Sequence, residues 1–205
     1  MLFKKFSDKS ATMGIWQMTE TLAELEAMYT VTADERPVYD GFRNDRRRKE
    51  WLTVRILLRE LLGKDVEICY RDTGKPYLKD SSYCISITHT IGYVGIRLAA
   101  HPVALDMEYK ADRVLRIIDR FVNEKEMKYI DERDQVSSAL VLWSAKETLF
   151  KLFDFQEVDF KEHLLISKMN WGTKGHFRGS VNKDGFIADV KLSFAVYGDL
   201  ILVYC

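Results

Sequence analysis

The sequence predicts an α+β protein built from two similar α/β halves that meet near residue 105. Each half contains one long helical segment, at residues 45–62 and 137–153, and short strand-like segments follow each of them. Only three prolines and eleven glycines interrupt the 205 residues, and no linker of low complexity separates the halves. We therefore expect one domain at residues 1–105 and a second at residues 106–205.

The first half is predicted to hold two helices. In the longer one, residues 45–62, apolar side chains recur at helical spacing from Trp51 onward, and Gly63 supplies a stop signal. The shorter one covers residues 19–29, where leucines and Met28 lie among glutamates. The other elements expected here are a strand at 66–70, a turn at 72–76 and strands at 82–87 and 92–99.

The second half is predicted to centre on the helix at residues 137–153, which is apolar over much of its surface. Turns at Lys183-Asp184-Gly185 and Tyr197-Gly198-Asp199 divide the C-terminal region into strands. The other expected elements are a strand at 103–109, helical segments at 112–121 and 124–133, and strands at 176–181, 187–197 and 200–204.

Charge and apolarity exclude several classes of protein. Basic and acidic residues number 31 each, and both halves carry them almost evenly, so binding of nucleic acid by bulk charge is excluded. No stretch approaches the roughly 18 apolar residues of a membrane span, and the first 16 residues hold no apolar run of signal-peptide length. Three widely separated cysteines argue against disulfides or a zinc site. We expect a cytoplasmic protein without a nucleic-acid or membrane partner.

Two carboxylates share one face of the strand predicted at residues 103–109. Alternate residues of a strand point the same way, so Asp106 and Glu108 lie together, opposite Leu105 and Met107. Neighbouring carboxylates repel one another unless a cation lies between them, and Mg²⁺ prefers such oxygen ligands. The alternative is an ordinary solvated strand face.

A second set of charges lies on the helix at residues 137–153. Ser144, Glu147 and Lys151 follow at steps of three and four and therefore share a face. One interpretation is a surface Glu–Lys pair that stabilises the helix by roughly 0.3–0.5 kcal/mol. The apolar neighbours of these residues favour another, since charges on a mostly buried helix need a partner such as a metal ion or a phosphate.

Two further groups suit phosphate binding. The strand that contains Thr88, His89 and Thr90 carries hydroxyls beside an imidazole, although a lone histidine is more often structural. Arginines precede the first long helix, and Lys75 lies in a Gly-Lys-Pro turn; a solvated helix start is the alternative for the arginines. The basic residues in question are Arg43, Arg46, Arg47, Arg48, Lys49 and Lys75.

The order and spacing of these motifs resemble the 4'-phosphopantetheinyl transferases, of the monomeric, two-halved kind that includes surfactin-synthetase activators. The most specific part is Trp143-x-x-Lys146-Glu147-x-x-x-Lys151 downstream of Asp106-x-Glu108. The resemblance covers about residues 46–151 and implies two halves in a pseudo-twofold arrangement. Gly74-Lys75-Pro76, Thr88-His89-Thr90 and Arg120-Phe121 with Glu126 complete the series.

The resemblance also assigns roles to these residues. It implies a Mg²⁺ site at Asp106, Glu108 and Glu147 and a catalytic role for Glu126 in deprotonating the attacking serine, with Glu124 as the alternative if the alignment shifts. Lys151 would contact the coenzyme A phosphates and take part in catalysis. The remaining coenzyme A contacts implied are Arg46 (or Arg47 or Arg48), Lys75, Thr88, His89 and, in a less defined role, Lys146.

The function implied is Mg²⁺-dependent transfer of 4'-phosphopantetheine from coenzyme A to a serine of an apo acyl or peptidyl carrier protein, with release of 3',5'-ADP. The first half would grip the coenzyme A nucleotide, and the second would hold the metal. Two alternatives stay open: a Mg²⁺-dependent phosphodiesterase that acts on coenzyme A or a nucleotide, and a non-catalytic binder of coenzyme A or carrier protein. The sequence does not distinguish carriers of fatty-acid, polyketide and peptide synthesis.

Overall fold

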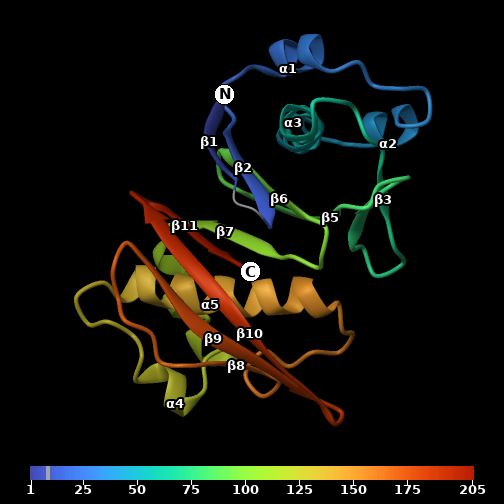
Figure 1. Ribbon diagram of the computed structural model, residues 1–205. Coiled ribbons are helices and arrows are strands. Elements are labelled where there is room, and N and C mark those ends of the chain that lie inside the picture. The colour runs from blue at the N-terminus through green and yellow to red at the C-terminus, as the bar shows by residue number, and fades with distance from the viewer. Residues whose placement is uncertain (8–9) are drawn as a thin grey trace. The chain divides into compact units, whose positions relative to one another are not determined.

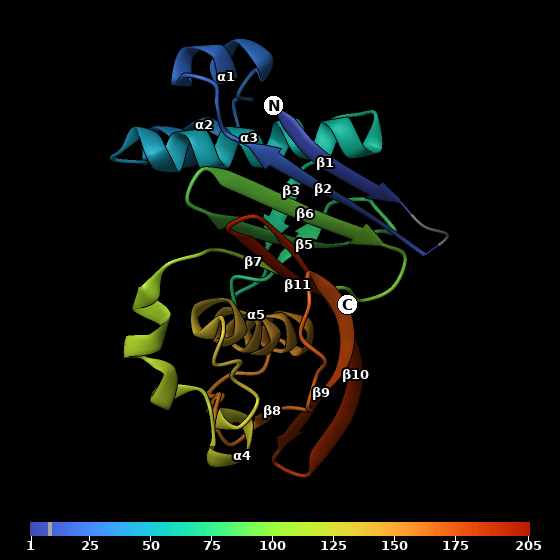
Figure 2. The ribbon, with the colours of Figure 1, turned by 90° about the vertical axis from the view of Figure 1, so that its left-hand side faces the viewer.

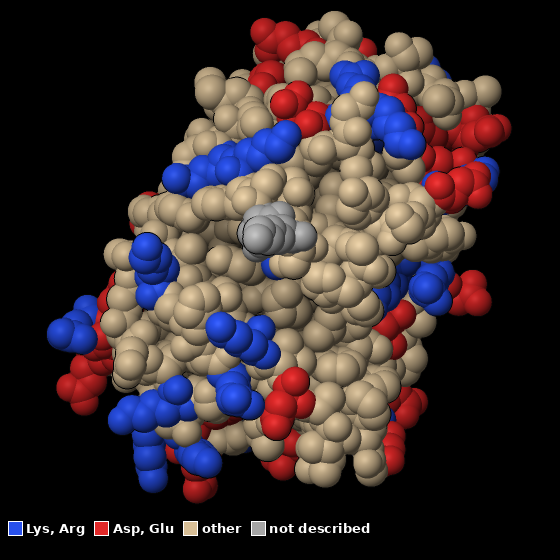
Figure 3. All heavy atoms as spheres, in the orientation of Figure 1, with Lys and Arg blue, Asp and Glu red and all other residues tan. Residues whose placement is uncertain are grey.

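A computed structural model describes residues 1–7 and 10–205 (Figure 1). The chain forms two compact units: Met1–Tyr70 with Pro76–His101, and Arg71–Lys75 with Pro102–Cys205. Each unit combines an antiparallel sheet with one long helix, which confirms the predicted α+β class. Both signs of charge are interspersed over the face seen in Figure 3, as the equal numbers of acidic and basic residues lead one to expect.

The first unit is built on a four-stranded antiparallel sheet with the order β1-β2-β6-β5. Helix α3 lies across one face of this sheet (Figure 2), and Leu52, Leu57 and Ile96 are among the buried residues of the core between them. The strands are β1 (Leu2–Ser7), β2 (Ala11–Gln17), β5 (Cys84–Thr90) and β6 (Tyr93–Ala99).

Helix α3 (Asp45–Leu62) begins and ends at clear sequence signals. The Asn44 side chain accepts a hydrogen bond from the backbone N–H of Arg47, and Gly63 closes the helix in the left-handed region, with φ 72°. Strand β2 approaches α3 closely at Gly14, where an added Cβ would lie 2.8 Å from a Leu57 methyl group. The other elements of this unit are α1 (Leu22–Met28), α2 (Arg36–Asp40) and the paired strands β3 (Ile68–Tyr70) and β4 (Pro76–Leu78).

The second unit is built on a five-stranded antiparallel sheet with the order β7-β11-β10-β9-β8. Helix α5 (Gln135–Phe153) packs on this sheet (Figure 1), and Leu142, Leu149, Leu192 and Val203 are fully buried in the core. The strands are β7 (Leu105–Tyr109), β8 (Leu164–Ile166), β9 (Lys174–Lys183), β10 (Phe186–Tyr197) and β11 (Leu200–Tyr204).

The two units share a connectivity. In each, the strand before the long helix (β2 or β7) pairs with the last strand (β6 or β11), which pairs in turn with the penultimate strand (β5 or β10). This common arrangement supports two similar halves, whereas their relation by a pseudo-twofold axis stays a prediction.

Several predicted segments differ from the structure. Residues 112–121 form two short 3₁₀ helices, η1 (Asp112–Arg116) and η2 (Ile118–Arg120), and α4 (Glu124–Met127) is a single turn. Segments this short gain little from helical hydrogen bonds alone, because the first turn costs more than it returns, and 3₁₀ turns are frequent in such connections. The elements missed altogether were β1, β2, α2, β4 and β8. No helix in the described ranges, 1–7 and 10–205, has the length and apolarity to cross a membrane.

Candidate active site

The site centres on strand β7, at one end of the second sheet. The alternation of the strand turns Asp106 and Glu108 to the face that meets α5, as their hydrogen bonds to Lys151 and Trp143 of that helix show. The predicted pairing of the two carboxylates on one face is therefore confirmed. Asp106 is buried and Glu108 partly buried. The alternative interpretation, an ordinary solvated strand face, is therefore excluded for these two residues.

Helix α5 turns a row of functional side chains toward β7. Its N-terminus is capped by Asp134, which accepts a hydrogen bond from the backbone N–H of Ser137. Trp143, Glu147 and Lys151 follow at steps of four residues and thus lie on one face of the helix. All three side chains are half-buried, whereas most of the residues between them are buried, so the packing of the helix fixes the direction of this face.

Direct contacts connect this helix face to the strand. Lys151 Nζ lies 2.7 Å from Asp106 Oδ1 and 3.2 Å from the carbonyl oxygen of Leu105. Trp143 Nε1 donates a hydrogen bond of 3.1 Å to Glu108 Oε1, and a guanidinium nitrogen of Arg113 lies 3.9 Å from Glu108 Oε2. Lys151 is thus paired with Asp106 of β7 rather than with Glu147 of its own helix.

The carboxylates of this face repel one another electrostatically. Burial, and then the charge of Asp106, raises the pKa of Glu147 to about 7, although Lys151 opposes the rise. Burial and Asp106 also raise the pKa of Glu108, against the hydrogen bond from Trp143. The three acidic groups therefore form one electrostatic cluster, which a cation would stabilise.

The chemistry of this cluster fits a hard divalent cation, because its donors are carboxylate oxygens. Asp106, Glu108 and Glu147 are the residues that would hold it. Their side chains do not converge as a finished cage: within the described parts of the chain, no three His, Cys, Asp or Glu side chains are arranged to hold a metal ion. Ligation would require rotation of these side chains, with Lys151 moving away from Asp106.

Lys75 lies at the C-terminal end of α5. Residues Arg71–Lys75 belong to the second unit, and Lys75 Nζ donates a 2.8 Å hydrogen bond to the carbonyl oxygen of Leu152. Thr73 fixes the same loop through a 2.9 Å hydrogen bond to Asp154 Oδ2. A cation is favourable at a helix C-terminus, and Lys75 comes in this way to the helix end that carries Lys151.

His89 belongs to a basic cluster in the first unit. Its Nε2 lies 3.1 Å from a guanidinium nitrogen of Arg47, and both Arg46 and Arg47 form ion pairs with Glu50, whose side chain is 3% exposed. Hydrogen bonds and charge from these partners hold the pKa of Glu50 below its ordinary value, although burial acts in the opposite direction. This cluster offers a phosphate two exposed guanidinium groups.

The contacts around His89 change two interpretations that were made from the sequence. Among the arginines, the structure groups Arg47 directly with His89, whereas Arg46 reaches the cluster through Glu50. Strand alternation also separates the predicted trio, because Thr88 and Thr90 are buried on one face of β5 and His89 is exposed on the other. Glu50 was missed, although its position three and four residues after two arginines on a helix was the available signal.

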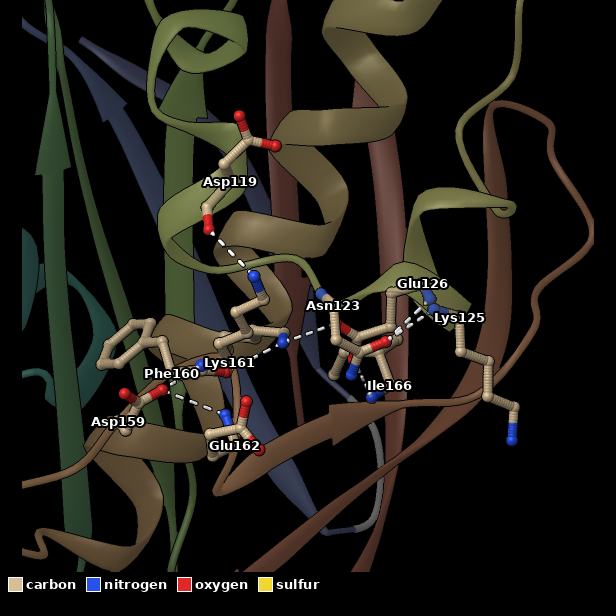
Figure 4. A network of polar contacts seen from close by, with 10 residues as sticks. Asp119, Asn123, Lys125, Glu126, Asp159, Phe160, Lys161, Glu162 and Ile166 are labelled. Atoms are coloured by element: carbon tan, nitrogen blue, oxygen red, sulfur yellow. Dashed lines mark hydrogen bonds and ion pairs between the residues drawn. The ribbon is translucent and has the colours of Figure 1, made fainter.

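Glu126 lies in a separate polar network (Figure 4), in which both Glu126 and its partner Lys146 are buried. Lys146 Nζ is 2.7 Å from Glu126 Oε2 and 2.8 Å from the carbonyl oxygen of Phe160. Burial lowers the pKa of Lys146, while Glu126 acts in the opposite direction. Glu126 is therefore buried rather than accessible to a substrate, and Lys146 does not reach the surface where a phosphate could contact it.

Comparisons with known proteins agree with the geometry of the second unit. The sequence model of the 4'-phosphopantetheinyl transferase superfamily matches residues 102–195. The 4'-phosphopantetheinyl transferase gsp of Aneurinibacillus migulanus is 29% identical over 107 residues, which are 50% of this chain and 45% of that relative. The match thus spans less than half the length of the relative. Residues 102–195, which include the acidic strand and the Trp-x-x-Lys-Glu-x-x-x-Lys helix, are thus similar to the 4'-phosphopantetheinyl transferase superfamily, which confirms the resemblance seen in the sequence.

Proposed function

We propose that this protein transfers 4'-phosphopantetheine from coenzyme A to a serine of an apo acyl or peptidyl carrier protein. The observation that carries the proposal is the β7–α5 face, where Asp106, Glu108 and Glu147 form one acidic cluster with Lys151 among them. This face lies within the region that matches the superfamily. Phosphoryl transfer depends chiefly on positioning and charge neutralisation, and this combination of residues can supply both.

The reaction is a substitution at the phosphorus that bears pantetheine. The serine oxygen forms a new bond to this phosphorus, the P–O bond of the pyrophosphate breaks, and 3',5'-ADP leaves. The serine proton passes to a carboxylate or to water. A bound Mg²⁺ would offset negative charge on the pyrophosphate.

The roles proposed for the protein's own residues follow from their positions. Asp106, Glu108 and Glu147 would hold the metal, and Lys151 would turn from Asp106 to a phosphate oxygen. Lys75 would add positive charge at the same end of α5. In the first unit, His89 with Arg46 and Arg47 would bind phosphates of coenzyme A.

Mass spectrometry of carrier proteins tests this function. Apo carriers from fatty-acid, polyketide and peptide synthesis are each incubated with the enzyme, coenzyme A and Mg²⁺, and we expect at least one to gain a phosphopantetheine group. Omission of Mg²⁺ and a carrier whose serine is replaced by alanine are the controls. The proposal also states that the protein acts in the cytoplasm and as a monomer. Light scattering of the purified protein tests its oligomeric state.

The same assay separates the alternatives. A phosphodiesterase would release 3',5'-ADP from coenzyme A in the absence of a carrier. A non-catalytic binder would retain coenzyme A or a carrier and modify neither. Either result would contradict the transferase proposal.

A further inference from the structure

The carboxylate of Glu126 is enclosed by hydrogen-bond donors from three parts of the chain. Oε1 accepts a 2.7 Å bond from the backbone N–H of Ile166 in β8, and Oε2 accepts from Lys146 Nζ at 2.7 Å and from the backbone N–H of Asn123 at 3.2 Å. The residue is 1% exposed. Asn123 completes a capping box at the start of α4, since its side chain accepts from the backbone N–H of Glu126 at 2.9 Å.

Lys146 is enclosed to the same degree. Its side chain is 0% exposed, and its ammonium group binds Glu126 and the carbonyl oxygen of Phe160. An ammonium group in such a place strongly destabilises the fold if its partner is removed, whereas an apolar pair of similar size can replace a buried ion pair at little cost. The Glu126–Lys146 pair thus joins α4, β8 and the backbone at Phe160 to the middle of α5.

A chain of contacts leads from this pair to the acidic face. The ring of Phe160 packs on Trp143 with centroids 5.6 Å apart and an interplanar angle of 30°. Phe121 packs edge-on against the same indole, with centroids 5.1 Å apart. Trp143 in turn holds Glu108 through its indole N–H. Lys146 also immediately precedes Glu147 on the same helix. The ion pair is therefore connected to two of the three acidic residues, to Glu108 through Trp143 and to Glu147 through the helix backbone.

We propose that Glu126 and Lys146 are positioning residues that act as one unit: the buried ion pair fixes the orientation of Trp143 and Glu147, and through Trp143 that of Glu108. That this pair affects the transfer of 4'-phosphopantetheine rests on the proposed function. Neither residue then touches the substrate, so this assignment replaces the base role implied for Glu126 and the coenzyme A contact implied for Lys146.

The geometry favours this assignment over direct catalysis. A general base must come within hydrogen-bond distance of the serine hydroxyl or of an intervening water. Glu126 already accepts bonds from an ammonium group and two backbone N–H groups, and it has almost no exposed surface. A base role would require the protein to open this network in every turnover.

The test compares Glu126→Gln, Lys146→Met and the double variant that carries both changes. Each single variant leaves a buried group without its ionic partner, so we expect the melting temperature to fall by on the order of 10 °C. The double variant removes both charges, and we expect it to recover at least half of that loss. Glu162→Gln and Lys125→Met, which change exposed charges nearby, are the controls.

Single-turnover transfer distinguishes positioning from base catalysis. If the pair positions the site, the double variant regains most of the rate lost in Lys146→Met and keeps the pH profile of the wild type. If Glu126 is the base, the double variant stays as slow as Glu126→Gln, about 10²–10⁴-fold below the wild type, and loses the dependence on pH that the base confers. This second result overturns the proposal.

A spectroscopic readout tests the pair without the transfer assay. The protein has four tryptophans, and 5-fluorotryptophan labelling should give a ¹⁹F resonance for each, with that of Trp143 identified in Trp143→Phe. Lys146→Met should shift the Trp143 resonance, and the double variant should bring it back toward the wild-type position. If the resonance does not move, the proposed positioning is wrong. If the resonance and melting results follow expectation but the wild type modifies no carrier, the proposed function fails and the structural role of the pair stands.

Discussion

The indole nitrogen of Trp143 donates a hydrogen bond to Glu108 across the contact between α5 and β7, over 3.1 Å. The hydrogen bond occupies one carboxylate oxygen, Oε1, and orients the group within the acidic face. Outer partners of this kind commonly orient metal ligands and change metal affinity when they are removed. Trp143 was noted in the sequence as part of a motif, and the structure gives it this specific contact.

Trp143→Phe should therefore weaken Mg²⁺ binding. The substitution keeps an aromatic ring between Phe121 and Phe160 but removes the N–H that orients Glu108. We expect a loss of about 10–100-fold in Mg²⁺ affinity, measured by calorimetry in the presence of coenzyme A. Trp171→Phe, which removes an indole hydrogen bond to the carbonyl oxygen of Tyr129, is the matched control. An unchanged affinity in Trp143→Phe would show that the indole does not orient a metal ligand.

Glu147→Gln should fold normally and lose most transfer activity. The change removes one negative charge at nearly constant shape from a cluster in which burial and Asp106 already raise the pKa of Glu147 to about 7. Folding should not suffer, whereas we expect a loss of at least about a hundredfold in transfer at fixed Mg²⁺, because less charge is available to hold the metal. A Mg²⁺ titration of the transfer rate checks this, with Glu132→Gln as a control. Near-wild-type transfer throughout the titration would exclude Glu147 as a ligand.

His89→Ala and Lys75→Ala should weaken coenzyme A binding more than carrier binding. Each removes a polar or charge-assisted contact, which typically contributes roughly 1.5–3 kcal/mol, or about a ten- to hundredfold change in affinity. Arg47→Ala should match His89→Ala, because the two side chains lie 3.1 Å apart. Calorimetry with coenzyme A measures all three variants. Unchanged affinity in both His89→Ala and Lys75→Ala would contradict their placement at the coenzyme A phosphates.

The sequence predicted best those features that depend on local periodicity. The limits expected for α3 agree with the structure because a continuous apolar stripe and a terminal glycine define them locally. Asp106 and Glu108 were placed on one face because alternation in a strand is fixed by backbone geometry. The strands β1 and β2 were missed because the adjacent Lys4 and Lys5 interrupt the apolar pattern of β1, and β2 contains a glycine whose role emerges only from its contact with α3.

Tertiary contacts, which periodicity does not reveal, determine which acidic residue at the start of α4 is buried. Glu126 follows Glu124 and Lys125, and nothing in such a run of charges shows which member turns inward. The structure buries Glu126 because Lys146, twenty residues later, and the N–H of Ile166, forty residues later, both converge on it. The division of roles between neighbouring acids therefore required the fold.

Acid should destabilise the first unit partly through Glu35. Burial alone would raise the pKa of this carboxyl, but hydrogen bonds from Arg55 and Tyr29 hold the pKa below its ordinary value of 4.5. The ionised form thus stabilises the fold above pH 4.5, and this contribution is lost as the pH falls through the lowered pKa. We expect Glu35→Gln to cost roughly 1.5–3 kcal/mol of unfolding free energy at pH 7, with the difference from wild type vanishing in strong acid. Urea unfolding at several pH values measures this, with the exposed acid Glu60→Gln as control. A difference that did not depend on pH would show that charge is not its source.

The last prediction concerns the acid on α4 that could accept the serine proton. The two candidates lie two residues apart, but Glu126 is enclosed and Glu124 is exposed at the first residue of the helix. A general base must reach its substrate, so a proton acceptor on α4 would have to be Glu124 if Glu126 positions the site. We expect Glu124→Gln to lower the single-turnover rate by about 10²–10⁴-fold and to leave Mg²⁺ and coenzyme A binding intact.

Glu126→Gln should instead show a fall in melting temperature together with its loss of rate, because it breaks the ion pair with Lys146. The comparison is made at saturating metal, with Glu132→Gln as the exposed control. If Glu124→Gln transfers at the wild-type rate and the Glu126→Gln, Lys146→Met double variant recovers, the proton acceptor lies outside α4.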